Sequence, residues 1–556
     1  MLLRRFFLAL SLQCWAAHGA YVQTRPCDDI VSSASSGPSL DVHFDVGHGK
    51  EKDVLQLNVE YALHQQACNL STFDFSATLH IDMLSRHSVS HGSNSSFCRR
   101  WSSRDGVYSG ASLIYALKFE LEPLPPVSTF NVRLQLESDV EHGSQCLEAE
   151  VTPALHTITS VSLVWVPRAT LLFVLLVGVL RCHNGRTQDL LHNLSTSDLC
   201  LPGVADCLGY MQWVFLSGGL SLHYPGFLQP IVSKLSLFSL FVAGPLTHGR
   251  VYHSVSDGIY SINGTYGGTA GLEHIHQIVG APSTVDTWVN MVIAIAIISA
   301  VMALLLETVA SERKLIGRRM APVAQESLSA RLLSRLTAIV RMVLSYFTLP
   351  LAALSFYQLS ASALLPMWHT VSATVLIISV ILAFIWLFRR LPSRTIGLLM
   401  HETPKWNHEQ NKQMPHTEGI YVGMVVALTL IRGATIGGLQ AFGPVQLALL
   451  AMSEVCLLLT IRWLQVHPWL CVSTILPVLR LTTTLLMICF VRGLVQDSTR
   501  SAVGYTVIAL HGSVLVLGIL LPATYHLVRS VKTAVRHSRP FVSTYPPIET
   551  YDKRSY

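Results

Sequence analysis

The sequence predicts a signal peptide, an all-β sandwich as a luminal domain, and then a polytopic α-helical membrane domain of about nine spans. Three observations predict this order: a short apolar segment after two arginines, alternating apolar residues over the next 140 positions, and long uncharged apolar runs after residue 160. The composition agrees, because 50% of the residues are hydrophobic, only 13% are charged and the mean hydropathy is +0.44. Soluble chains carry about 25% charged residues. We therefore expect a chain built mainly for lipid.

Residues 1–19 have the three parts of a secretory signal peptide. Arg4 and Arg5 form the positive region, Phe6 to Leu12 form the apolar region, and Ala17-His18-Gly19 forms a small-residue cleavage site. The alternative is an uncleaved anchor, but the apolar region is well short of the about 20 residues that a span needs. We expect the mature chain to begin near Ala20, in a lumen.

Residues 20–160 show the period-two alternation that is typical of half-buried strands. The alternating apolar positions are Leu55, Leu57, Val59, Tyr61 and Leu63; Phe75, Ala77, Leu79, Ile81 and Met83; Leu113, Tyr115, Leu117, Phe119 and Leu121; and Phe130, Val132, Leu134 and Leu136. The intervening positions are mainly polar, and Gly-Ser and Pro-Pro pairs fall in the connections. The pattern predicts two antiparallel sheets packed on one apolar layer.

This region also carries cysteines and glycosylation motifs that suit an oxidising lumen. The four cysteines, Cys27, Cys68, Cys98 and Cys146, predict two disulfides in one of three connectivities. A metal site is the weaker alternative, because no Cys-x-x-Cys spacing accompanies them. The glycosylation sites expected on the luminal side are Asn69, Asn94 and Asn263.

Residues 161–528 contain the long apolar runs of the membrane domain. The nine predicted spans are 161–181, 206–223, 287–308, 336–356, 366–388, 419–438, 444–463, 469–491 and 502–528. With the amino terminus in the lumen, nine crossings place the tail, 529–556, in the cytosol. Twenty basic residues then fall in cytosolic stretches and four in luminal loops between spans, which supports this orientation.

The long connection 223–286 begins at a helix-breaking sequence, His223-Tyr224-Pro225-Gly226. Because proline lacks a backbone donor and glycine is a poor helix former, the second span should end there. Residues 227–246 should then lie along the luminal interface or re-enter the membrane. The alternative is a continued, tilted helix.

The segment Gln212 to Pro225 resembles a segment of a known family. Its Gln212, Ser217-Gly218, Leu220-Ser221 and Tyr224-Pro225 match the Gln…Ser-Gly-x-Leu-Ser-x-x-Tyr-Pro pattern of the fungal TRP-like family, which includes the flavin carrier proteins. The architecture of that family, an ML-like lipid-recognition domain followed by a TRP-like transmembrane domain, covers nearly the whole chain. The resemblance implies flavin nucleotide transport or calcium-permeable cation conduction, and a luminal domain that takes up an acyl chain or sterol. The short tail departs from many relatives and puts regulation through the tail in doubt.

No enzyme motif is present: the sequence lacks Gly-x-Ser-x-Gly, a Walker loop and His-Glu-x-x-His. We expect a protein that is not an enzyme and needs no cofactor. Glu273-His274-x-His276 could hold a metal, but no further ligands are identifiable, so we expect no metal site. The glycine-rich residues 264–271 read as a flexible loop rather than a phosphate cradle.

The strongest candidate site residues are charges near the centres of predicted spans: Arg341, Arg432, Glu454 and Arg480. A charge at that depth costs roughly 2.5–3.5 kcal/mol on insertion scales, so such groups face the bundle interior and find partners. One acid between two arginines would leave an interior that attracts anions. The alternative is an ion pair that only fixes helix packing. His511 is a further candidate, for a proton-linked step.

These residues lead to two main hypotheses. The first is a carrier for an anionic or amphipathic solute, with flavin nucleotide as the candidate that the resemblance implies. The second is a TRP-like calcium-permeable channel, and a third class is a lipid-binding adaptor that transports nothing. The partners expected are membrane lipid or sterol at the luminal domain and a small-molecule or ion substrate, without nucleic acid; the chain could form a homo-oligomer. We expect residence in an endomembrane, either endoplasmic reticulum or vacuole, with the plasma membrane as the alternative.

Overall fold

The computed structural model describes nine strands between Tyr21 and Thr152, residues 127–129 and 155, and then residues 157–184, 202–241, 271–279, 284–317, 328–363, 365–390, 415–465 and 472–538. The predicted signal peptide, 1–19, lies outside these residues, as does the tail from 539 onward.

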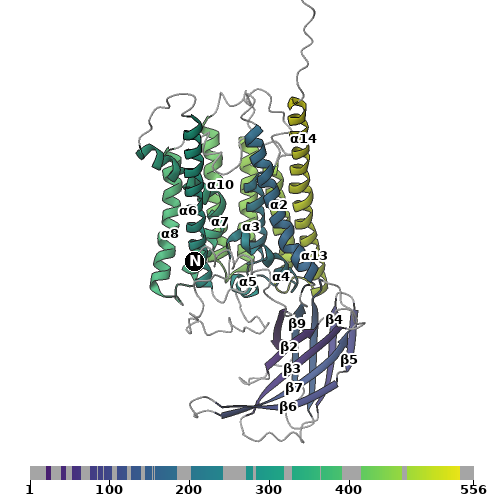
Figure 1. Cartoon of the computed structure of the whole chain (residues 1–556). Coiled ribbons are helices and arrows are strands. Elements are labelled where there is room, and N and C mark those ends of the chain that lie inside the picture. The colour runs from purple at the N-terminus through teal and green to yellow at the C-terminus, as the bar shows by residue number, and fades with distance from the viewer. Residues whose placement is uncertain are drawn as a thin grey trace, which may run out of the picture.

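The nine strands form two antiparallel sheets (Figure 1). One sheet has the order β1 (Tyr21–Pro26), β9 (Gln145–Thr152), β8 (Phe130–Ser138), β4 (Phe75–Met83), β5 (Arg86–His91). The other has the order β2 (Ser39–Asp45), β3 (Asp53–Leu63), β7 (Ser109–Leu121), β6 (Ser93–Ser102). Four of these strands, β3, β4, β7 and β8, lie where the sequence alternates. Their luminal location stays a prediction.

The strand register pairs the alternating sets with one another. Leu57 is opposite Leu117 in the β3–β7 pair, and Leu79 is opposite Leu134 in the β4–β8 pair. Because side chains repeat every two residues along a strand, such pairing assigns both apolar sets to the same side of their sheet. A slip by one residue would reverse that assignment.

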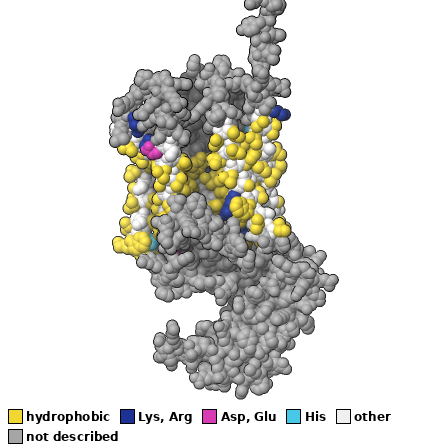
Figure 2. Space-filling view, in the orientation of Figure 1, with side chains coloured by type: hydrophobic (Ala, Val, Ile, Leu, Met, Phe, Trp, Pro, Cys, Tyr) yellow, Lys and Arg dark blue, Asp and Glu magenta, His cyan; other side chains and the backbone are white. Residues whose placement is uncertain are grey.

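A bundle of helices follows the strands (Figure 1). Within the described residues, eight helical segments are long and apolar enough to cross a membrane: Ile158–Leu180, Asp286–Thr308, Arg331–Ser360, Met367–Arg390, Gly419–Gly438, Gly443–Leu464, Val472–Phe490 and Asp497–Arg529. They belong to α2 (Thr157–Asn184), α6 (Thr284–Gly317), α7 (Leu328–Ser360), α8 (Met367–Arg390), α10 (Pro415–Gly438), α11 (Gly443–Leu464), α12 (Val472–Leu486) with η5 (Met487–Phe490), and α13 (Asp497–Ser513) with the π-helical η6 (Val514–Leu520) and α14 (Leu521–Ser538). The prediction of a multi-pass helical membrane protein is confirmed. Figure 2 shows that hydrophobic side chains cover much of the outer surface of these helices.

The segment predicted as a span at 206–223 does form a helix in the bundle, but this helix is shorter than the predicted full-length span. Its helix, α3 (Val204–Ser217), has only 14 residues, which is about 21 Å against the about 30 Å of a hydrocarbon core. Ten of these residues are buried, on all sides of the helix. A helix enclosed by protein can end below the membrane surface, because neighbouring side chains satisfy its free backbone groups. The helix α3 therefore does not need to be as long as the hydrocarbon core is thick.

The chain leaves α3 at Gly218 and stays inside the bundle. The short helices α4 (Leu228–Val232) and η3 (Ser233–Ser239) follow, and α5 (Gly271–Val279) lies beside them. The predicted break before Pro225 is present, but the helix ends several residues earlier than 223. Phe227, Leu228 and Phe241 are at most 1% exposed, so residues 227–241 form part of the core instead of lying along the interface.

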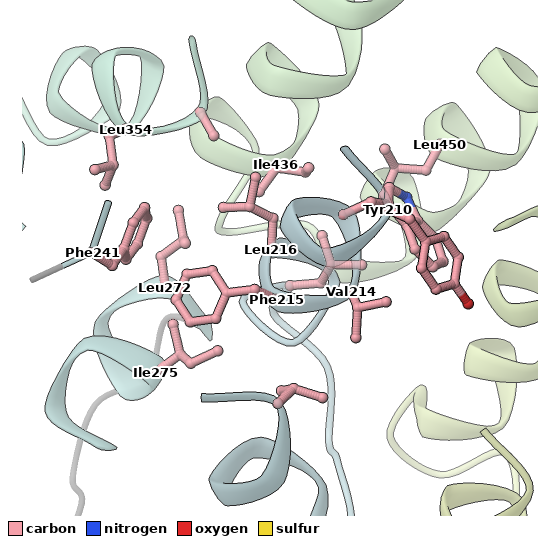
Figure 3. Close-up of a cluster of buried hydrophobic side chains, with 14 of the residues drawn as sticks. Tyr210, Val214, Phe215, Leu216, Phe241, Leu272, Ile275, Leu354, Ile436 and Leu450 are labelled. Atoms are coloured by element: carbon pink, nitrogen blue, oxygen red, sulfur yellow. The ribbon is translucent and has the colours of Figure 1, made fainter. Parts of the chain in front are cut away.

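The main apolar core surrounds α3 (Figure 3). Phe215 of α3 meets Phe241 edge to face, with ring centroids 4.8 Å apart. Leu272 of α5, Leu354 of α7 and Ile436 of α10 pack into the same cluster. Segments far apart in the sequence thus close around one short helix, which fixes the relative positions of the helices that carry the site.

Helices α7 and α10 approach closely because α10 lacks side chains at two positions. A Cβ at Gly433 would lie 2.5 Å from the Ala352 methyl, and a Cβ at Gly437 would lie 1.8 Å from the Ala353 carbonyl oxygen. Small residues that allow such backbone approach are typical of membrane helix interfaces.

The strands contact the bundle at one end (Figure 1). The Tyr505 hydroxyl donates to the Val127 carbonyl oxygen at 2.8 Å, and the Asn131 amide donates to the Asp497 carboxylate at 3.0 Å. The first contact joins residue 127, just before β8, to the middle of α13, and the second joins β8 to the first residue of α13. The strands and α13 therefore share one junction.

Candidate functional site

The main candidate site is a buried charge cluster on three consecutive helices. Glu454 of α11 accepts two hydrogen bonds from Arg480 of α12, at 3.0 Å from Nε to Oε1 and at 3.1 Å from Nη2 to Oε2. Arg432 of α10 places its Nε 3.1 Å from the same Oε1 and donates to the Ser453 hydroxyl at 3.0 Å. The structure thus brings together three of the four predicted intramembrane charges.

Burial strengthens the attraction between these charges, and it also makes the loss of any one of them costly. The side chains of Glu454 and Arg432 are 1% and 7% exposed, and that of Arg480 is 15% exposed. Two parallel hydrogen bonds between a guanidinium and a carboxylate fix the geometry, and the low dielectric strengthens the attraction. Removing one partner of such a buried pair costs about 3–5 kcal/mol. The cluster holds two positive charges and one negative charge, so its net charge is positive.

Arg341 does not join this cluster. It lies on α7, where its side chain is partly exposed, and among the described residues no ion pair with it is found. The position within a span was a sound signal for a costly charge, but depth alone does not say which neighbour a side chain meets.

His511 of α13 joins a second group instead. The Tyr210 hydroxyl of α3 lies 2.9 Å from His511 Nδ1, and the rings of Tyr210 and Trp213 both meet the imidazole at steep angles. Arg480 lies within electrostatic range of the Tyr210 hydroxyl. Sequence reasoning missed Tyr210, because its partner lies 301 residues away.

Tyr210 and His511 line a cavity of about 140 Å³ whose walls come from α2, α3, α4, η3, α13 and η6. Leu163 of α2, Val214 of α3 and Leu515 of η6 are among its apolar lining residues. The cavity wall is almost entirely hydrocarbon, so its contribution to function is shape and apolar surface.

The four motif residues hold the break after α3. Gln212 donates to the carbonyl oxygens of Phe238 and Tyr346, at 2.9 and 2.7 Å. The Tyr224 hydroxyl donates to the Ser217 carbonyl oxygen. These bonds satisfy backbone groups inside the core, which is the structural need at an interrupted helix.

Gly218 and Pro225 complete this break. A Cβ at Gly218 would lie 2.6 Å from Val232, and the Pro225 carbonyl oxygen accepts the first amide of α4, from Leu228, at 2.9 Å. Their roles in the structure are to allow close packing and to start the next helix.

Two glutamines at the α10–α11 turn were missed by sequence reasoning. Gln440 accepts from the Ser221 hydroxyl at 2.9 Å and from the Leu272 amide at 3.1 Å. Gln446 accepts from the Ser221 amide at 2.9 Å. Both side chains are at most 8% exposed, and together they tie the break after α3 to α5 and to α11.

Glu273 and His276 of α5 are buried, and His274 is partly buried. Glu273 accepts a hydrogen bond from the Tyr357 hydroxyl of α7. Burial lowers the pKa of His274 and of His276 to about 4. Within the described parts of the chain, no group of three His, Cys, Asp or Glu side chains could hold a metal ion.

The structure describes only some of the residues predicted to form disulfides or carry glycans. Cys27, Cys68, Asn69 and Asn263 lie outside the described residues. Asn94 and Cys98 are on β6, and Cys146 is on β9, which belongs to the other sheet. Both the disulfides and the glycans stay predictions.

No protein-family model, curated protein or solved structure matches this chain.

Proposed function

We propose that this multi-pass membrane protein transports an anionic or amphipathic organic solute. The observation that carries the proposal is the cluster of Arg432, Glu454 and Arg480, in which one carboxylate is shared by two guanidiniums inside the bundle. A positive excess in low dielectric attracts an anion far more strongly than the same charge would in water. Intramembrane ionisable groups commonly mark a solute pathway.

A calcium-permeable channel is the second candidate. The described turns between the helices provide few of the groups that a cation filter needs. Cation filters need rings of backbone carbonyls or acidic side chains. The turns 361–366 and 439–442 contain no acidic residue, and the carboxylate of Glu454 is already bound on both oxygens. Glu307, near the end of a span, pairs with Arg335. The charge distribution therefore favours an anion.

The resemblance in the segment Gln212 to Pro225 suggests flavin nucleotide as the first solute to test. A flavin nucleotide combines an apolar ring system with a phosphate, which is the solute class that the cluster suits. Flux of labelled flavin nucleotide and of calcium should be measured side by side in vesicles that contain the purified full chain. Calcium flux without flavin nucleotide flux would favour the channel.

The competing reading of the cluster is purely structural, and a set of variants separates the two. Glu454→Gln leaves two arginines less compensated, so both readings expect it to impair folding. The triple variant Arg432→Gln, Glu454→Gln, Arg480→Gln has no buried charge left at this site. Under the structural reading it regains folding and transport together.

Under the transport reading, the triple variant folds and reaches the membrane but loses at least about tenfold in solute flux, because one decade corresponds to only 1.4 kcal/mol of lost stabilisation. The matched control is Glu307→Gln with Arg335→Gln, which removes an ion pair at the more exposed end of α6 and α7. It should keep normal flux. Normal flux through a well-folded triple variant would exclude the proposal.

Endomembrane residence and lipid uptake by the stranded region belong to the same proposal. The tail residues Tyr545-Pro-Pro-Ile548 have the Tyr-x-x-apolar form of a sorting signal. A tagged copy should therefore be found in internal membranes. Residence solely at the plasma membrane, unchanged when 541–556 are deleted, would contradict this.

A further inference from the structure

The cavity beside Tyr210 lies where two of its wall helices depart from regular α-helix. Pro167, inside α2, lines the cavity, and proline removes a backbone hydrogen bond and bends a helix. The π-helical η6 begins directly after Gly512 and Ser513 of α13. Single π-helical turns are rare and occur frequently at functional sites. Two local departures on facing walls leave a space that regular helices would close.

The cavity borders the lipid-facing surface. Trp165 and Val166, next to Pro167, are 55% and 47% exposed, and Val516 and Leu517, next to Leu515, are 47% and 63% exposed. These side chains belong to spans and are apolar, so hydrocarbon covers the outer faces of α2 and η6 next to the cavity-lining residues.

The depth of the cavity identifies the part of a lipid that reaches it. His511 lies close to the middle of the span Asp497–Arg529. At mid-bilayer the ends of acyl chains are the abundant groups, whereas head groups and the polar end of a sterol lie near the interfaces. The two polar lining groups, Tyr210 and His511, already bond to each other. A pure hydrocarbon segment leaves this hydrogen bond in place.

The volume of the cavity also suits a short hydrocarbon segment. An apolar cavity of about 150 Å³ stays dry and takes up benzene, and this cavity measures about 140 Å³. It accommodates a segment of about six carbons, estimated from that benzene-sized precedent. An empty cavity forfeits dispersion contacts on every wall, so filling it stabilises the fold. We propose that the cavity binds the terminal segment of a phospholipid acyl chain that enters from the bilayer between α2 and α13.

Gly512 makes this proposal testable. It lines the cavity, and a Cβ built on it would meet no atom within 4 Å. Gly512→Leu should fill part of the cavity, because there is open space where its side chain begins. Gly178→Leu is the matched control, because Gly178 of α2 also has open space around its Cβ and lies outside the cavity lining. Leu163→Phe fills the cavity from the opposite wall.

The full chain is placed in nanodiscs of phosphatidylcholine that includes a species with a photoreactive diazirine near one chain end. After irradiation, mass spectrometry maps the labelled residues. We expect labelling of α3 and α13 at residues that line the cavity. Gly512→Leu and Leu163→Phe should each reduce this labelling at least fivefold, and Gly178→Leu should leave it unchanged.

Thermal melting establishes that each variant is folded. Unchanged labelling in folded cavity-filling variants would overturn the proposal, as would labelling of these residues by a photoreactive sterol but not by the phospholipid. The measurement does not involve solute flux, so it is independent of the proposed transport function.

Discussion

Replacing Gly437 by alanine should force α10 away from α7. The new Cβ would lie 1.8 Å from the Ala353 carbonyl oxygen and 2.8 Å from the Tyr357 backbone nitrogen. Ordinary carbon–oxygen contacts are about 3.3 Å, so the helices must separate by about 1.5 Å. Neither atom belongs to a flexible side chain. The backbone of one helix has to move.

The expected cost follows from that displacement. A gap of 0.5–1 Å already forfeits a quarter to a half of a contact's dispersion energy, and overpacking costs typically about 1–3 kcal/mol. Alanine returns about 0.5–1 kcal/mol through its better helix propensity. We expect a net loss near the upper end, about 2–3 kcal/mol. At about 2–4 °C per kcal/mol, the apparent Tm should fall by about 4–12 °C.

The control is the next residue in the same helix. A Cβ at Gly438 would meet only the Phe356 Cβ, at 3.9 Å. Gly438→Ala gains helix propensity without a clash and should keep or slightly raise the apparent Tm. The assay is thermal unfolding of both purified variants in one detergent. Equal melting temperatures for the two variants would refute the inferred close approach.

Two further variants test buried polar groups. Gln212→Leu leaves two core carbonyl oxygens without their donor, and at about 1–3 kcal/mol for each the apparent Tm should fall by several degrees; a change below about 1 °C would count against this role. Burial lowers the pKa of His276 from 6.5 to about 4, so between these pH values the unfolded chain binds a proton that the folded chain does not. Stability should therefore decrease as the pH falls below 6.5, by about 2 kcal/mol at pH 5. His276→Gln should reduce this slope in melts from pH 7 to 5, and an unchanged slope would contradict the assignment.

The elements with strong local periodicity were predictable from the sequence. The alternation from Leu55 to Leu63 and from Leu113 to Leu121 coincides with β3 and β7. Their pairing and the strand order were not predictable, because both depend on contacts between segments far apart in the chain. The long spans were predictable for the same reason as the strands: each carries its signal within one window of residues.

The short helix α3 could not be recognised as a central element from composition. Its residues are as apolar as those of a span, and hydropathy does not distinguish a helix enclosed by protein from one enclosed by lipid. The polar groups of Gln212 and Tyr210 within it were the available signal. On a lipid-exposed helix these polar groups would lack hydrogen-bond partners.

The charge cluster was predictable and the polar network around it was not. Arg432, Glu454 and Arg480 lie on consecutive spans at similar depth, and the cost of isolated charges in lipid predicts that they pair. Gln440 and Gln446 lie near helix ends, where glutamine is ordinary, so their burial could not be inferred. Their placement on both sides of one short turn was the only hint in the sequence.

The enclosure of α3 also determines when the molecule can finish assembling. The partners of its polar side chains arrive late in synthesis: the carbonyl of Tyr346 is 134 residues away from Gln212, and His511 is 301 residues away from Tyr210. Until α13 is made, the phenol of α3 has no histidine beside it and the wall that carries Leu515 does not exist. A chain that stops before this point lacks the residues of α13 and η6 that pack against α3. The segment from α13 to α14 therefore completes the bundle, and a chain that lacks it would expose residues near the start of the membrane domain.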